Sequence, residues 1–94
     1  MKVNIGTNSG HLETKALATA EIMGYTWFVH KDDFDDYRVS EWETGMYAYH
    51  CDAGFENAIP LARAYLESKG QQRVDEVIKQ AREMFGTVNP PYQP

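Results

Sequence analysis

The chain has 94 residues and a formal net charge of −5 at pH 7, and 43% of its residues are hydrophobic. This length suits one small domain, and the scattered Lys and Arg residues argue against direct binding to nucleic acid phosphates. The lone Cys51 excludes an internal disulfide, and no apolar run approaches the ~20 residues of a membrane-spanning helix, so we expect a soluble, cytoplasmic protein.

The first quarter of the chain predicts a strand followed by a helix. Residues 2–5 alternate between polar and apolar side chains and end at Gly6, which is typical of a short strand. Residues 12–23 carry apolar side chains at helical spacing, with Ser9 as a candidate N-cap and Gly24 as the stop.

The middle of the chain predicts three strands. Residues 25–30 are rich in aromatic and β-branched side chains. Residues 37–42 and 46–51 then form a hairpin around Glu43-Thr44-Gly45, which suits a three-residue loop with glycine in the left-handed region.

This hairpin register assigns a face to each side chain. It pairs Arg38 with His50 and Ser40 with Ala48 on one face, and clusters apolar side chains on the other. We expect the second face, which carries Tyr37 with Cys51, Val39 with Tyr49 and Glu41 with Tyr47, to meet the core. Trp42 pairs with Met46 near the hairpin tip, and we expect this pair to be exposed on the first face.

The last part of the chain predicts two helices and a tail. The first helix follows the turn at residues 52–54 and runs to about Lys69, and Pro60 fits it best if Asn57 is the N-cap. The second helix spans residues 71–85. Each carries an apolar stripe and is followed by a glycine. Residues 87–94 contain three prolines and predict a flexible tail beyond a single domain spanning residues 1–86. The order β-α-β-β-β-α-α predicts an α+β fold, in which helices cover one face of an antiparallel sheet of three to four strands.

The acidic residues gather in one stretch. Eight of the fourteen lie between Asp32 and Glu56, and the bases in or directly beside this stretch are Lys31 and Arg38. Aromatic side chains accompany them, and aromatic anchors beside charged rims are typical of protein interfaces. We therefore predict a non-catalytic interaction protein that docks on a basic surface, such as that of a nucleic-acid-processing complex. The candidate partner-binding residues are Asp32, Asp33, Asp35, Asp36, Glu41, Trp42, Glu43 and Met46.

Catalytic and metal motifs are missing from the sequence. None of the serines lies in a G-x-S-x-G elbow, so we predict neither an enzyme nor a cofactor. His30, His50 and Cys51 lack the spacing of a zinc site, and strand alternation sends His50 and Cys51 to opposite faces, so no metal site is predicted.

Two alternative functions stay open. Residues 5–11 have the outline of a strand, a glycine loop and a helix, so an anion-binding domain or enzyme that uses the Gly6–Gly10 loop is one alternative. A homodimeric structural subunit joined through the apolar stripe of residues 74–85 is the other.

Two resemblances accompany these patterns. The order helix, three strands, helix over residues 12–66 resembles double-stranded-RNA-binding domains. Those domains carry a basic cluster where this chain has Gly54-Phe55-Glu56-Asn57, so RNA binding is not implied. In size, acidity and lack of catalytic motifs the chain is similar to small phage-borne inhibitors, including anti-CRISPR proteins and DNA mimics, which implies a partner that handles nucleic acid.

Overall fold

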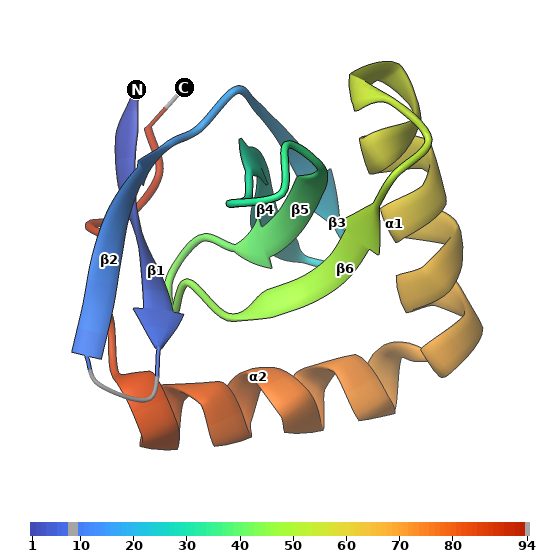
Figure 1. Ribbon diagram of the computed structural model, residues 1–94. Coiled ribbons are helices and arrows are strands. Elements are labelled where there is room, and N and C mark those ends of the chain that lie inside the picture. Colours follow the sequence, from blue (N-terminus) through green and yellow to red (C-terminus); the bar gives the residue numbers. More distant parts are fainter. Residues whose placement is uncertain (8–9, 94) are drawn as a thin grey trace.

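Two antiparallel sheets and two helices make up the structure, a computed structural model that describes residues 1–7 and 10–93 (Figure 1). The first sheet is a hairpin of β1 (Lys2–Thr7) and β2 (Gly10–Lys15). The second has the order β3-β4-β5-β6 and consists of β3 (Ala18–Ile22), β4 (Tyr25–Lys31), β5 (Tyr37–Glu41) and β6 (Tyr47–Cys51). The helices α1 (Phe55–Lys69) and α2 (Gln71–Phe85) follow. This is the α+β fold that the sequence predicts.

The predicted helix over residues 12–23 is wrong, because this segment forms β2 and β3. Met23 and Gly24 adopt positive φ angles of 54° and 86°, and Ile22 pairs with Tyr25 across them. Two residues with positive φ between paired strands are the geometry of a tight type I′ hairpin. Gly24 therefore turns a hairpin instead of ending a helix, and the likeness to double-stranded-RNA-binding domains is lost with that helix.

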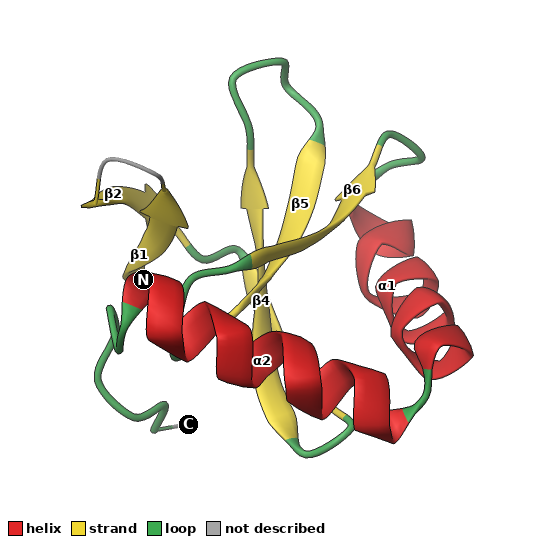
Figure 2. Cartoon of the chain, turned by 90° about the horizontal axis from the view of Figure 1, so that it is seen from below, coloured by secondary structure: helices red, strands yellow, loops and turns green. Residues whose placement is uncertain are grey.

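Both helices pack against one face of the four-stranded sheet and enclose the main core (Figure 2). The sheet contributes Trp27, Val29, Val39 and Cys51 to this core, and the helices contribute Ala58, Ala62, Leu66, Val74 and Ile78. The predicted core face of the hairpin is thereby confirmed for Tyr37, Val39, Tyr49 and Cys51, whereas Tyr47, also predicted on that face, is exposed. Val74 and Ile78 of the apolar stripe of α2 are buried in this core. No helix among the described residues is long and apolar enough to cross a lipid bilayer.

The opposite face of the sheet is also covered, by the β1–β2 hairpin and the C-terminal segment. Phe28 and Trp42 form a second apolar cluster with Val3 of β1, and Tyr92 packs against it. Residues 87–93, for which the sequence predicts a flexible tail, lie beside β1 in the structure (Figure 1). The sheet is therefore sandwiched between helices on one side and a hairpin with a strap on the other.

The register of the β5–β6 hairpin is confirmed over its first three pairs, which include Val39 with Tyr49. A bulge then shifts the pairing, so Ser40 lies opposite Tyr47 instead of Ala48. The Glu41 N–H accordingly donates to the Met46 carbonyl at 2.9 Å. Because a bulge adds one residue to one strand, the predicted pairs nearest the tip are wrong by one position.

Candidate interaction surface

The loop between β4 and β5, residues 32–36, carries four of the eight predicted site residues and is called the acidic loop below. It projects from the end of the four-stranded sheet (Figure 2). One oxygen of Asp32, Oδ1, accepts hydrogen bonds from the backbone N–H of Phe34 at 2.9 Å and of Asp36 at 3.1 Å. The Asp32 N–H donates to the Asp36 carbonyl at 3.0 Å and closes the loop. The Asp32 side chain thus fixes the loop by mimicking a backbone turn.

Asp32 itself is not available to a partner, because its side chain is only 6% exposed. Its other oxygen, Oδ2, lies 3.4 Å from Nε of Arg38 and 3.6 Å from Nε2 of His50. Burial opposes ionisation, but the N–H groups of Phe34 and Asp36 and the nearby Arg38 outweigh it and hold the pKa of the Asp32 carboxyl below its usual range. Asp32 is therefore an ionised internal support of the loop.

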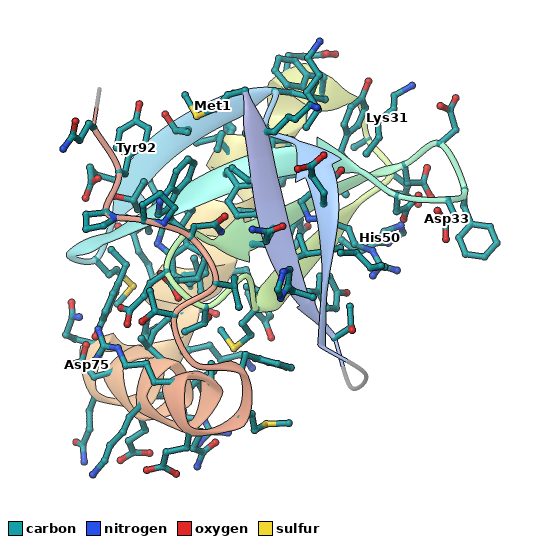
Figure 3. All side chains as sticks on the ribbon, turned by 90° about the vertical axis from the view of Figure 1, so that its left-hand side faces the viewer. Met1, Lys31, Asp33, His50, Asp75 and Tyr92 are labelled. Carbon is teal, nitrogen blue, oxygen red and sulfur yellow. The ribbon has the colours of Figure 1, made fainter. Side chains whose placement is uncertain are left out.

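The remaining acids of the loop divide into paired and outward-facing groups. Asp36 Oδ2 lies 3.0 Å from Nε2 of His50, and Asp35 Oδ1 lies 2.5 Å from Nζ of Lys31. Asp33 is exposed and lies at the outer edge of the molecule, while His50 lies closer to the sheet (Figure 3). Phe34, between Asp33 and Asp35, is 81% exposed. The outermost part of the loop is thus the phenyl ring of Phe34 between two exposed acids, Asp33 and the Lys31-paired Asp35.

The predicted exposure of Trp42 is wrong, because its side chain is only 7% exposed. Its indole N–H donates to the Pro90 carbonyl at 2.6 Å, and its ring meets Phe28 at 5.8 Å and Tyr92 at 4.9 Å between centroids. The register placed Trp42 on the correct face. That face is covered by β1 and the C-terminal strap, which the sequence pattern of the hairpin does not reveal.

Glu41 and Glu43 also serve the fold instead of facing a partner. The buried Glu41 carboxylate accepts hydrogen bonds from the N–H of Glu43 at 2.6 Å and from the N–H and Oγ1 of Thr44 at 3.0 and 2.7 Å. Glu43 binds the Arg82 guanidinium, with both carboxylate oxygens 3.0 Å from Nε. This hydrogen bond lowers the pKa of Glu43 more than burial raises it. Both glutamates therefore stabilise the β5–β6 hairpin tip.

The eight predicted site residues do not form one surface. Residues 32–36 precede β5, whereas residues 41–46 begin at its last residue, so the two groups lie at opposite ends of the strand. Met46, in the second group, is half-buried against the main core. The residues that the structure describes therefore do not form the acidic surface beside an exposed Trp42 that the sequence predicts. What is exposed is one small group of residues at the tip of the acidic loop.

A cluster at the base of the acidic loop has the donor types of a metal site. Asp32, Asp36 and His50 bring one ligand atom each within 4.8 Å of one another. The Arg38 guanidinium already places a positive charge beside Asp32, which opposes a second cation there. Sequence reasoning missed this cluster, although the predicted pairing of Arg38 with His50 places both residues at the loop end of the sheet. The predicted divergence of His50 and Cys51 is confirmed, since Cys51 is buried and His50 is exposed.

His30 and Ser40 form a pair with the residue types of a nucleophile and its base. Nε2 of His30 lies 2.8 Å from Oγ of Ser40, and the backbone carbonyl of Lys31 lies 3.3 Å from Nδ1. Burial lowers the pKa of His30, which favours the neutral ring. Both side chains are buried between the two sheets, so the pair satisfies two internal polar groups.

The Gly6–Gly10 segment does not form the predicted anion cradle, because a strand follows Gly10 where that cradle needs a helix. Asn8 and Ser9 lie outside the described residues. Close packing requires glycine at position 6, because a Cβ there would lie 2.7 Å from Cγ of Phe85 and 2.8 Å from the Thr44 carbonyl oxygen.

A pocket of about 250 Å³ opens at the corner between β6, the end of α1 and the start of α2. Buried apolar side chains line it, among them Trp27, Leu66 and Ile78, and Lys69 and Arg73 stand at its edge. No sequence pattern indicates this pocket, because it depends on how two helices meet a strand.

No protein-family model matches the chain, and comparisons with curated proteins and with solved structures found no match.

Proposed function

We propose that this protein is a non-catalytic interaction module that binds a basic protein surface through the acidic loop, with Phe34 as the apolar anchor. The observation that carries the proposal is the 81% exposure of Phe34 on a loop whose backbone is held by Asp32. Aromatic side chains that are presented on a rigid support lose little conformational freedom on binding, so they are effective anchors.

The charges beside Phe34 define the partner. Asp33 and Asp35 flank the ring, so a complementary surface offers an apolar pocket bordered by Lys or Arg. A cytoplasmic protein that handles nucleic acid carries such basic surfaces, and an inhibitor of the phage type would use the loop to occupy one. The support for this partner class is the charge and shape of one loop. Extended phosphate mimicry has less support, because Glu41 and Glu43 are engaged in the fold.

The test is a capture experiment with purified variants. The immobilised protein retains its partner from a host lysate, and retention weakens as salt is raised because charge steers the encounter. Phe34→Ala and Asp33→Asn/Asp35→Asn abolish retention. The control variant Met84→Ala, which removes a highly exposed apolar side chain from α2, leaves retention unchanged. Equal retention by the wild type and the Phe34 variant would refute the proposal.

A further inference from the structure

The pocket at the β6–α1–α2 corner has the size of a single side chain. Its volume of about 250 Å³ lies below the roughly 300–1,000 Å³ of pockets for drug-sized ligands. An apolar cavity of about 150 Å³ already takes up benzene. The pocket therefore accommodates one aromatic ring with its attachment to a chain.

The two basic residues at the edge of the pocket favour a ring that has negatively charged neighbours. Lys69 and Arg73 are exposed there, on either side of the turn between α1 and α2. Nζ of Lys69 lies 5.1 Å from the ring centroid of Tyr65, and Nη1 of Arg73 lies 3.7 Å from Oε2 of Glu76. Because such exposed contacts are weak, both cations can turn toward carboxylates of an incoming segment.

An aromatic ring flanked by two carboxylates is what the acidic loop presents in Asp33-Phe34-Asp35. The loop cannot reach the pocket of its own chain. It precedes β5, whereas the pocket is lined by Met46 and Tyr47, which follow β5 at the other end of the strand. Figure 2 shows the β4–β5 loop projecting from one end of the strands, with α2 crossing the sheet at a distance from that loop.

We propose that the acidic loop of one copy inserts Phe34 into this pocket of a second copy, with Asp33 and Asp35 facing Lys69 and Arg73. The inference rests on the proposed function, since it names a second copy of the chain as a partner of the same loop. The contact is head-to-tail, so each copy in a pair keeps one unused loop or pocket, and association continues into chains or a ring.

The experiment is sedimentation velocity with two variants of the full chain. The loop variant, Phe34→Ala, lacks the inserted ring, and the pocket variant, Lys69→Glu/Arg73→Glu, repels the acidic loop. The wild type associates as its concentration is raised, and each variant alone associates about tenfold or more weakly. Mixed together, the two variants form 1:1 dimers and nothing larger, because one supplies only a working pocket and the other only a working loop.

Matched controls separate this contact from a general effect of charge. Lys15→Glu/Lys79→Glu makes the same charge change at exposed positions away from the pocket and leaves association at the wild-type level. A wild type that stays monomeric at millimolar concentration overturns the inference, and so does a mixture that stays monomeric. In either case the proposed function still stands if lysate capture depends on Phe34.

Discussion

Asn89 joins three parts of the fold, and its removal tests whether the C-terminal strap is docked. Its side chain accepts a hydrogen bond from the Asn4 N–H at 2.8 Å. It donates to the Asn4 carbonyl at 2.9 Å and to the Trp42 carbonyl at 2.7 Å. The residue is only 4% exposed, so water does not replace these bonds readily.

The substitution Asn89→Ala should lower the free energy of unfolding by about 3 kcal/mol. Each hydrogen bond contributes on the order of 1 kcal/mol net, and the variant leaves backbone groups of Asn4 and Trp42 without their partner. In a domain of this size a loss of ~1 kcal/mol shifts the melting temperature by roughly 4–8 °C. We expect a decrease of well over 10 °C.

Urea unfolding followed by tryptophan fluorescence measures this change, because Trp42 reports on the strap directly. Asn57→Ala is the matched control, since the exposed Asn57 side chain has a single hydrogen bond, to the Ala53 carbonyl. It should change stability by about 1 kcal/mol or less. If Asn89→Ala changed stability no more than this control, the strap would not be docked in solution and the account of Trp42 burial would fail.

Three further predictions concern the fold and its titration. Gly45→Ala should destabilise the protein by about 3 kcal/mol or more in the same urea assay. The new Cβ would lie 2.5 Å from the Gly6 nitrogen, and the φ of +67° at this position is strained for alanine. A neutral effect would contradict the close contact between Gly45 and β1. Burial lowers the pKa of His30 below 6.5, so the imidazole binds a proton more readily in the unfolded chain than in the folded one, and the urea midpoint should fall as the pH drops below about 6.5. The variant His30→Gln should reduce that fall. If the variant and the wild type had the same pH profile, His30 would not be the titrating group. The Tyr25 hydroxyl donates to the Asp75 carboxylate at 2.6 Å, and this bond, with burial, raises the pKa of Tyr25 to about 12. Titration followed by tyrosine absorbance should show a tyrosine that ionises near this pH in the wild type and at lower pH in Asp75→Asn. Unchanged titration in the variant would disprove the pairing.

Local patterns were sufficient where neighbours in sequence decide the structure. The helix over residues 71–85 and the first pairs of the β5–β6 hairpin follow from periodicity and turn chemistry. The segment 12–23 was misassigned because its apolar spacing fits a helix, whereas β1 and β4 offer strand partners on either side of it. Pairing with distant strands outweighs a weak local preference.

The candidate site was misjudged for a similar reason. The register gave the correct face for Trp42, but that face is covered by residues far away in sequence. The sequence also could not show that Asp32 points inward to hold its own loop, or that Phe34 is the most exposed of the aromatic residues. Long-range contacts thus decided which members of the acidic, aromatic stretch reach the surface.

The bonds between Asn4 and Asn89 join residues 85 positions apart, so the side of the sandwich formed by the hairpin and the strap closes only after these distant segments meet. Until residues 87–93 dock, the indole at position 42 stays accessible to chaperones and to aggregation.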